Sequence, residues 1–420
     1  MINRPKGTKD VVPAEAYKWQ FVEGVAKWEL RCHGFSEIRT PVFEHTELFV
    51  RGVGEGSDIV NKEMYTFLDK GDRSITLKPE GTASIVRAIV ENGLDNEAMP
   101  LKLFMLTPCF RYERPQAGRL REHHQFSIEA FGSYSPLMDA EVISVVKSIL
   151  DRLNFTNYLI NINSIGCKNC RGKYMEALKA YYSKHIDGMC HDCKVRYEKN
   201  PLRLLDCKEE GCAKYKANAP KPIDYICGEC HEHFEALKNI LDRMGVRYKV
   251  NNNLVRGIDY YTRTVFEFLT EEKGALNVIC GGGRYDGLVS ELEGKELPAV
   301  GIGLGIEHLL LLLEKNGIEL PNTNNLELYL VNADESALAD TIKFATILRK
   351  NDVIVDYDTI GRSVKAQMKY ANKIGAKNVI VLGGDEIQKN ECKIKNMITG
   401  EETIVKFNEI EKIRKIVKGV

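Results

Sequence analysis

The sequence predicts an α+β protein built around a long antiparallel hairpin, with a cysteine-rich insertion and a separate C-terminal α/β domain. Two extended runs, residues 101–113 and 123–132, flank a loop that contains Arg, Pro and Gly, which is typical of a hairpin with a basic tip. Beyond residue 325, strand-like and helical segments alternate as βαβαβ, which indicates a mainly parallel sheet. Between these two regions, residues 167–230 contain eight of the twelve cysteines.

Hydrophobic spacing predicts the remaining elements in order along the chain. They are a helix over 14–32, a loop over 51–58, a helix over 138–153, a strand over 158–163, further strands within 247–269, a glycine-lined strand and a buried helix within 298–317, a linker over 322–325, and C-terminal helices near 335–350 and 362–375.

Length and composition limit the class of protein. A chain of 420 residues is long enough for roughly two to four domains. Lys and Arg number 59, the same as Asp and Glu, so net charge does not drive binding to nucleic acid, although a local basic groove is not excluded. The longest aliphatic run, Leu309–Leu313, is far too short for a membrane span, and the N-terminal residues lack the apolar segment of a secretion signal. We therefore expect a cytoplasmic protein with no membrane partner.

The eight clustered cysteines form four spaced pairs, which are Cys167 and Cys170, Cys190 and Cys193, Cys207 and Cys212, and Cys227 and Cys230. Spacers of two or four residues let two thiolates converge on one tetrahedral ion, so that each pair supplies half of a four-thiolate site. The pattern predicts two structural Zn²⁺ sites. The pairs can combine sequentially, interleaved or nested, and the alternative is a set of free thiols in an irregular segment. A redox role is disfavoured because no βαβ context surrounds any pair.

Other cysteines and nearby histidines are expected to play no part in these sites. Because eight thiols already complete two sites, we expect the neighbouring histidines to be surface residues, namely His185, His191, His231 and His233. The isolated cysteines are expected to be small buried side chains, namely Cys32, Cys109, Cys280 and Cys392.

The hairpin has an unusually polar face. Because side chains alternate along a strand, Gln125, Ser127 and Glu129 share one face. On the preceding strand, Arg111 and Glu113 are expected to point together. Such a face either lies in solvent or lines a polar pocket, and the loop arginines Arg114, Arg119 and Arg121 favour binding of an anion such as phosphate.

Other segments supply further polar groups. Arg256 and Arg263 flank the paired Tyr260 and Tyr261, and the sequence KPEGTA puts polar residues at a probable helix start. The glycines of GGGRYDG and AVGIGLG allow close approach of a ligand to the backbone. The spacing of GIGLG is not that of a Rossmann fingerprint, and the sequence contains no P-loop. A nucleotide site would therefore have to use an antiparallel sheet and arginines.

Together these motifs resemble one family closely, the histidyl-tRNA synthetases, which are class II aminoacyl-tRNA synthetases. The resemblance spans nearly the whole chain and is carried by GTKDVVP, TLKPEGTASIVRA, FRYERPQAGRLREHHQFSIEAFG, LVRGIDYYTRTVFEF and GGGRYDGL. It implies a homodimer with an antiparallel active-site sheet, an insertion that contacts the acceptor arm of tRNA, and a C-terminal anticodon-binding domain. The implied segments are a catalytic domain over 1–164 and 239–321, the insertion over 165–238 and the anticodon-binding domain over 325–420.

The resemblance also implies a role for each site residue. The implied histidine ligands are Glu80, Thr82 and Gln125 for the ammonium group, and Glu129 and Tyr261 for the two ring nitrogens, with Tyr260 alongside. The implied ATP ligands are Arg111, Glu113, Arg119, His123, Arg256 and His308, of which Arg111 and Arg256 are the candidate catalytic residues at the α-phosphate. Preorganised cations there would stabilise the charge that develops as the histidine carboxylate attacks.

One position departs from the family pattern. The third class motif normally ends in an arginine that grips the terminal phosphate, but here the sequence is GIEH, with His308 at that position. An imidazole is mostly neutral at pH 7 and lacks the bidentate fork of arginine. Two interpretations remain open: His308 contacts ATP weakly while another cation or Mg²⁺ carries more of the phosphate charge, or His308 only packs within its helix.

The sequence thus predicts an enzyme that uses ATP and Mg²⁺ to join L-histidine to tRNA(His) through a histidyl-adenylate. A catalytically idle paralogue that senses histidine is the alternative, but such paralogues typically lack the anticodon-binding domain and degrade the arginine motifs. A zinc-dependent RNA-binding protein is a third possibility, and it would leave the pocket of Glu80, Gln125 and Glu129 without a purpose.

Overall fold

The computed structural model describes residues 2–207, 209–270, 278–322 and 325–419. The chain divides into two compact units, Met1–Leu320 and Pro321–Val420, which are described separately. The boundary falls just before the linker expected over 322–325, of which residues 323 and 324 lie outside the described residues. Among the described residues, no helix is both long and apolar enough to cross a membrane.

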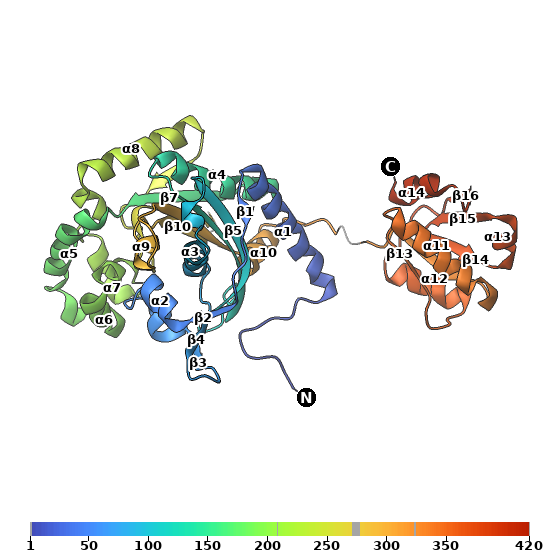
Figure 1. Ribbon diagram of the computed structural model, residues 1–420, viewed down its shortest axis with the longest axis horizontal. Helices are drawn as coiled ribbons and strands as arrows, with labels where there is room; N and C mark the ends of the chain where they lie inside the picture. The colour runs from blue at the N-terminus through green and yellow to red at the C-terminus, as the bar shows by residue number, and fades with distance from the viewer. Residues whose placement is uncertain (1, 208, 271–277, 323–324, 420) are drawn as a thin grey trace. The chain divides into compact units, whose positions relative to one another are not determined.

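An eight-stranded sheet forms the centre of the first unit (Figure 1). The strand order is β1 (Ser36–Glu37), β5 (Leu101–Phe110), β6 (Glu122–Phe131), β11 (Ala299–Gly305), β10 (Val278–Arg284), β9 (Thr262–Thr270), β7 (Tyr158–Ser164) and β8 (Tyr248–Val250). Neighbouring strands from β5 to β7 are antiparallel, and only the two edge strands β1 and β8 pair in parallel. The predicted hairpin is confirmed as β5 and β6, which pair from Leu101 and Phe131 to Phe110 and Glu122.

The hairpin strand ends earlier than the sequence suggested. β5 stops at Phe110, so Arg111 and Glu113 lie in the connecting loop rather than on the strand. The backbone of Arg111 still donates a hydrogen bond to the Arg121 carbonyl oxygen, which keeps the two sides of the loop together at its base.

One face of the sheet carries the main hydrophobic core. Phe126, Ile128 and Ala130 of β6 point to this face and pack against helices on the same side. Those helices are α1 (Pro13–Cys32), α4 (Pro136–Arg152), α8 (Gly228–Arg243) and α10 (Ile306–Lys315). The helices expected over 14–32 and 138–153 are therefore confirmed as α1 and α4.

The opposite face of the sheet is covered by α3 (Thr82–Glu91), α9 (Leu288–Glu291) and the cysteine-rich segment. That segment is helical, with α5 (Lys168–Tyr182), α6 (His191–Lys199) and α7 (Glu210–Lys216) before α8. Its side chains share one hydrophobic cluster with α3 and β5, so the insertion packs onto the sheet through a common core. Beside it, α2 (Thr46–Val53) adjoins a small antiparallel sheet of β2 (Phe43–His45), β4 (Ser74–Leu77) and β3 (Tyr65–Leu68).

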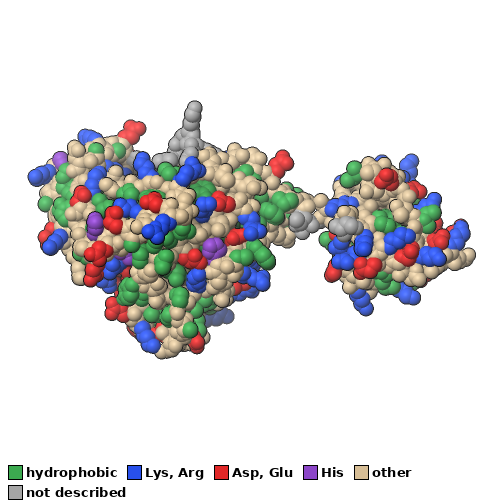
Figure 2. All heavy atoms as spheres, turned by 90° about the horizontal axis from the view of Figure 1, so that it is seen from above, with side chains coloured by type: hydrophobic (Ala, Val, Ile, Leu, Met, Phe, Trp, Pro, Cys, Tyr) green, Lys and Arg blue, Asp and Glu red, His purple; other side chains and the backbone are tan. Residues whose placement is uncertain are grey.

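The second unit is a five-stranded sheet of order β13 (Val355–Tyr357), β12 (Leu328–Asn332), β14 (Asn378–Leu382), β15 (Glu391–Asn396) and β16 (Glu402–Lys406). Its helices are α11 (Leu338–Lys350), α12 (Val364–Lys373), α13 (Gly384–Lys389) and α14 (Ile410–Lys418). The first three strands are parallel, as the βαβαβ pattern predicts. The expected single final strand is instead an antiparallel hairpin, because the short turn between β15 and β16 leaves no room for a crossover helix. Figure 2 shows positive and negative side chains interspersed on this unit, in keeping with its 16 Lys and Arg against 14 Asp and Glu over residues 325–420.

Candidate active site

Glycines form the floor of a recess on the polar face of the sheet. In β10 and β11, Gly281 pairs with Gly303, and Gly283 pairs with Gly301. A Cβ atom at Gly301 would collide with the Glu129 carboxylate, and one at Gly281 would collide with the Arg256 guanidinium. The two side chains therefore lie across the backbone of neighbouring strands, in space that a Cβ atom at either glycine would occupy.

Glu129 lies at the bottom of this recess and is 1% exposed. Its Oε1 accepts a hydrogen bond from the Thr82 hydroxyl at 2.7 Å, and its Oε2 accepts one from the Tyr285 hydroxyl at 2.5 Å. Burial raises the pKa of Glu129 to about 8, against the opposing effect of these two hydrogen bonds. A ligand that brings a positive charge or an N–H donor to this carboxyl would offset the cost of burying its ionised form.

Three tyrosines line the recess beside Glu129. The ring centroids of Tyr260 and Tyr261 are 4.7 Å apart, and those of Tyr260 and Tyr285 are 5.3 Å apart. Burial raises the pKa of all three phenols, so each hydroxyl is a neutral donor or acceptor near pH 7. The sequence prediction named Tyr260 and Tyr261 but missed Tyr285, although the motif GGGRYDG that contains it was noted for its glycines.

Glu80 closes one end of the recess at the start of α3. Its carboxylate accepts hydrogen bonds from the backbone N–H groups of Thr82 at 2.7 Å and Ala83 at 2.8 Å, so it caps the helix. The predicted helix start is therefore confirmed. Gln125 lies across Gly303, and its Nε2 donates a hydrogen bond to the Ser127 hydroxyl at 2.9 Å. The structure thus brings the predicted histidine-binding residues together on one face of the sheet.

Two arginines border the recess. Arg111 donates a hydrogen bond from Nε to the Pro79 carbonyl oxygen at 2.8 Å, which leaves the terminal nitrogens of its guanidinium for a ligand. Arg256 Nη1 lies 3.7 Å from Glu267 Oε2, and its guanidinium carbon is 6.0 Å from the Tyr261 ring centroid. Arg263, the other arginine of this motif, faces away from the recess and pairs with Glu229 and Asp286.

The loop between β5 and β6 carries the remaining predicted cations. Arg119 is 55% exposed, and its Nη1 lies 3.9 Å from Glu113 Oε2. Arg121 stacks its guanidinium over the Tyr112 ring at 3.8 Å. Arg119 is thus more exposed than Arg111, Arg121 and Arg256, which are all half-buried.

Two histidines adjoin this loop, His123 at its base and His308 near Gly118. Burial and the charge of Arg111 lower the pKa of His123 to about 3, so this ring is neutral. Burial also lowers the pKa of His308, and a Cβ at Gly118 would meet its Nδ1. That nitrogen is buried and has no hydrogen-bond partner among the residues that the structure describes. His308 therefore packs under the tip of the loop.

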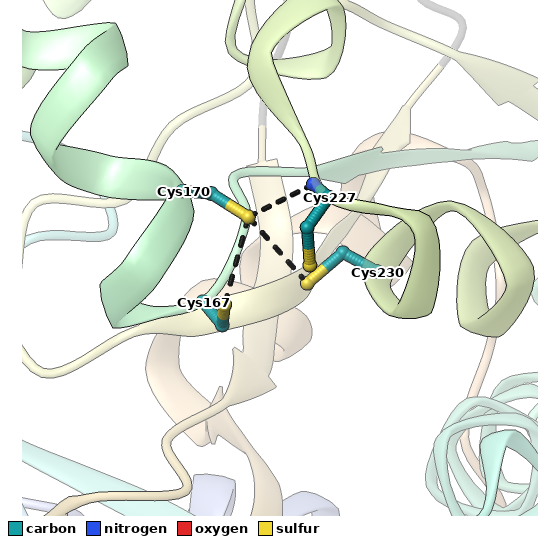
Figure 3. Close-up of side chains that lie close together, drawn as sticks. All are labelled: Cys167, Cys170, Cys227 and Cys230. Atoms are coloured by element: carbon teal, nitrogen blue, oxygen red, sulfur yellow. Dashed lines mark hydrogen bonds between the residues drawn. The ribbon is translucent and has the colours of Figure 1, made fainter.

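The eight clustered cysteines form two groups with nested pairing. The outer cluster is Cys167, Cys170, Cys227 and Cys230, and the inner cluster is Cys190, Cys193, Cys207 and Cys212. Within each cluster, all sulfur atoms lie within 4.8 Å of one another. Figure 3 shows the outer cluster, in which the pairs come from the starts of α5 and α8.

The sulfur spacing fits a tetrahedral metal site. Zn–S bonds of about 2.3 Å place tetrahedral sulfurs about 3.8 Å apart. The Sγ atoms of Cys170 and Cys230 are 3.9 Å apart, and those of Cys190 and Cys207 are also 3.9 Å apart. Disulfide sulfurs would be about 2.05 Å apart. The backbone N–H of Cys227 also donates a hydrogen bond to Cys170 Sγ at 3.0 Å.

Expectations for the neighbouring residues were right in part. His191 and His231 are exposed, but His185 stacks on the Tyr215 ring at 4.7 Å. His233 is buried and contacts Asp139 Oδ2 at 2.6 Å, because it lies on the face of α8 that packs on the sheet. Cys32 is exposed at the end of α1, contrary to expectation, whereas the other isolated cysteines are buried as expected, namely Cys109, Cys280 and Cys392.

Comparison with known proteins identifies relatives over the whole chain. The family described as histidyl-tRNA synthetase matches residues 7–309, and the anticodon binding domain family matches residues 322–416. The histidine–tRNA ligase of Caldanaerobacter subterraneus subsp. tengcongensis is 53% identical, over 97% of this chain and 98% of its own. The histidine–tRNA ligase of Halothermothrix orenii is 48% identical, over 99% of this chain and 100% of its own. The apo crystal structure of the S. aureus histidyl-tRNA synthetase is 37% identical, with a TM-score of 0.83 over 100% of this chain and 99% of its own.

Proposed function

The chain belongs to the histidyl-tRNA synthetase family and is an ATP-dependent histidine–tRNA ligase, and from this premise we propose how its residues perform the reaction. The observation that carries the proposal is the buried carboxyl of Glu129, which lies among three phenols beside two arginines. Free histidine offers an imidazole, an ammonium group and a carboxylate, and the recess has a complement for each.

The imidazole is held by Glu129 together with the phenols of Tyr261 and Tyr285, and Tyr260 packs alongside. Tyr285 orients the Glu129 carboxyl by its hydrogen bond, so that the carboxyl can accept from a ring N–H. An amino acid without ring nitrogens leaves these buried polar groups unpaired, which gives discrimination at the binding step. Glu80, Thr82 and Gln125 bind the ammonium group.

ATP occupies the arginine side of the recess. Arg111 and Arg256 bind the α-phosphate, Glu113 accepts from the adenine amino group, and Arg119 reaches the terminal phosphates. Neutral His123 stacks on the adenine, and His308 supports the loop that covers the nucleotide. The histidine carboxylate attacks the α-phosphorus, pyrophosphate leaves, and the ribose hydroxyl of tRNA then attacks the acyl carbon of the adenylate. Arg256 and Arg111 stabilise the charge on the reacting phosphate, and Mg²⁺ bound with ATP would offset further phosphate charge.

Each cysteine cluster holds one structural Zn²⁺. Four thiolates complete a tetrahedral site and leave no open position for catalysis, so zinc stabilises the insertion rather than taking part in the reaction. Reduced thiols in metal sites also suit a reducing compartment, which supports a cytoplasmic location. Removing zinc should lower the melting temperature of the protein, and metal analysis after purification without added zinc should give two ions per chain.

The enzyme acts as a homodimer that uses its C-terminal domain to bind the anticodon of tRNA(His). Residues 1–164 and 239–321 form the catalytic domain, 165–238 the insertion that contacts the acceptor arm, and 325–420 the anticodon-binding domain. Phe43, Phe67 and Leu68 of the small sheet are at least 48% exposed, and a partner subunit would bury such apolar side chains. Sedimentation of the purified enzyme at micromolar concentration should give twice the chain mass.

Histidine-dependent exchange of pyrophosphate into ATP tests the assignment of the recess. Wild-type protein should show the exchange, and Glu129→Gln should raise the KM for histidine by roughly one to two orders of magnitude, because a buried charge-assisted hydrogen bond is lost. Glu232→Gln, an exposed substitution of the same kind on α8, is the control. Unchanged histidine kinetics in Glu129→Gln would refute the assignment. A histidine-sensing paralogue would bind histidine without any exchange.

A further inference from the structure

The segment that carries the pocket tyrosines has little regular structure of its own. Residues 251–261 form turns and irregular backbone between β8 and β9, yet they supply Arg256, Tyr260 and Tyr261 to the recess. Side chains that must be placed to a fraction of an ångström usually lie on helices or strands, so this segment needs support from outside.

Arg171 supplies part of that support from the insertion. It follows Cys170 directly on α5. Its Nη1 donates a hydrogen bond to the Asp259 carbonyl oxygen at 3.3 Å, and its Nη2 donates one to the Tyr261 carbonyl oxygen. These two carbonyl groups flank Tyr260. One side chain next to a cysteine of the outer cluster therefore fixes the backbone on both sides of a pocket tyrosine.

A second link joins the outer cluster to the end of the same segment. The backbone N–H of Arg263 donates to the Gly166 carbonyl oxygen at 2.8 Å, and that of Ile165 donates to the Arg263 carbonyl oxygen at 2.8 Å. Gly166 directly precedes Cys167, and its φ of +73° and its close approach to Cys170 require glycine. Arg263 itself has a φ of +50°, a conformation that a side chain rarely adopts without surrounding constraints.

A metal ion in the outer cluster would place negative charge beside these links. A Zn²⁺ ion with four thiolates has a net charge of about −2. Arg171 interacts electrostatically with Cys167, and Arg263 does so with Cys167 and Cys230. The two guanidinium groups thus offset the charge of the occupied site. The ion would tie the start of α5 to the start of α8 through four sulfurs, and without it that tie is absent.

We propose that the outer cysteine cluster, through Arg171 as a positioning residue, holds the Asp259–Tyr261 segment in the conformation that binds histidine. The site of Cys167, Cys170, Cys227 and Cys230 therefore supports amino-acid recognition in addition to stabilising the insertion. This inference rests on the proposed zinc site and on the proposed histidine pocket. It predicts that loss of the ion weakens histidine binding while ATP binding persists.

Substitution of Arg171 tests the positioning role without touching a cysteine. Arg171→Met should raise the histidine Kd, measured by equilibrium dialysis without ATP, by roughly tenfold or more, since two hydrogen bonds to the segment are lost. The KM for ATP and the zinc content should stay within twofold of wild type. Arg171→Lys can reach one of the two carbonyl groups, so its histidine Kd should lie between those of wild type and Arg171→Met. Lys173→Met is the matched control, because Lys173 is an exposed cation on the same helix.

A double-mutant cycle tests the link to the metal. Cys230→Ser should raise the histidine Kd. The double variant Cys230→Ser with Arg171→Met should have a histidine Kd no higher than that of the single variant with the higher Kd, because both changes act on one path. Multiplicative effects would overturn the proposal. Where Cys230→Ser fails to fold, wild-type protein stripped of zinc by a chelator takes its place, with circular dichroism to verify the fold.

The outcomes separate this inference from the pocket assignment. A histidine Kd within twofold of wild type in Arg171→Met would overturn the inference, while the response of Glu129→Gln would still test the pocket. Equal histidine affinity in zinc-loaded and zinc-free protein would likewise overturn it. A raised histidine Kd with pyrophosphate exchange retained at saturating histidine would support it, because the reacting groups are then intact.

Discussion

The histidine side and the ATP side of the recess are built in different ways. On the histidine side, Glu129 is 1% exposed on a central strand, and both of its oxygens already accept hydrogen bonds. On the ATP side, Arg119 is 55% exposed on a loop, and its Nη1 lies 3.9 Å from Glu113 Oε2. Burial makes the first side selective, because an unpaired polar group there is costly. In the proposed binding mode, exposure leaves the second side adaptable, and the triphosphate supplies further partners for its arginines.

This contrast predicts that the histidine side tolerates an added side-chain atom less well than the ATP side does. Gly301→Ala should have the largest effect of any single methyl group, because its Cβ would collide with the Glu129 carboxylate and the Ile128 carbonyl oxygen. We expect kcat/KM for histidine to fall by at least about 100-fold, which corresponds to nearly 3 kcal/mol. Gly305→Ala on the same strand is the control, because a Cβ there meets nothing within 4 Å. Equal activity in the two variants would contradict the proposed recess.

Arg256 joins the two sides, and its loss should act on the chemical step. Arg256→Met should lower kcat for pyrophosphate exchange by roughly 100- to 1,000-fold, the range for removing one preorganised group at a developing charge. The histidine Kd measured without ATP should change much less. Arg256→Lys keeps the charge but not the fork, so it should recover only part of kcat. A variant with normal kcat and a raised histidine Kd would instead make Arg256 a ligand of the amino acid alone.

Burial of Glu129 should also be visible in stability. Its pKa is about 8 in the folded chain against an ordinary value of 4.5, so between these values the folded state binds more protons than the unfolded state. The free energy of unfolding therefore falls as pH rises from about 4.5 to about 8. Glu129→Gln removes this dependence, and in the absence of ligands it should be more stable than wild type at pH 8 by an amount on the order of a few kcal/mol. Parallel urea unfolding curves at pH 5 and pH 8 measure the difference, and an equal pH dependence in the two proteins would contradict the prediction.

The parts of the site that follow local rules were predictable from the sequence. Strand alternation put Gln125, Ser127 and Glu129 on one face, and the helix start at Thr82 followed from its neighbours. The nested pairing of the cysteines was not predictable, because it depends on where α5 and α8 meet in space. Tyr285 was missed because its contact with Glu129 joins β6 to the residue after β10, which is far away in the sequence. The burial of His233 against Asp139 was also not predicted, because these two residues are far apart in the sequence.

His308 offers the smallest and most specific test of the ATP side. It packs under Gly118 of the loop, with a lowered pKa, so it brings no charge to the nucleotide at pH 7. His308→Arg restores the cation that the family pattern has at this position and should lower the KM for ATP by a few-fold, about 1 kcal/mol or less. It should leave the histidine Kd unchanged, because the residues of the histidine side are held by hydrogen bonds that do not involve His308. Asn316→Arg, which adds the same charge two turns further along the chain, is the control. If both variants keep the wild-type KM for ATP, His308 is a packing residue of the loop and takes no part in offsetting the phosphate charge.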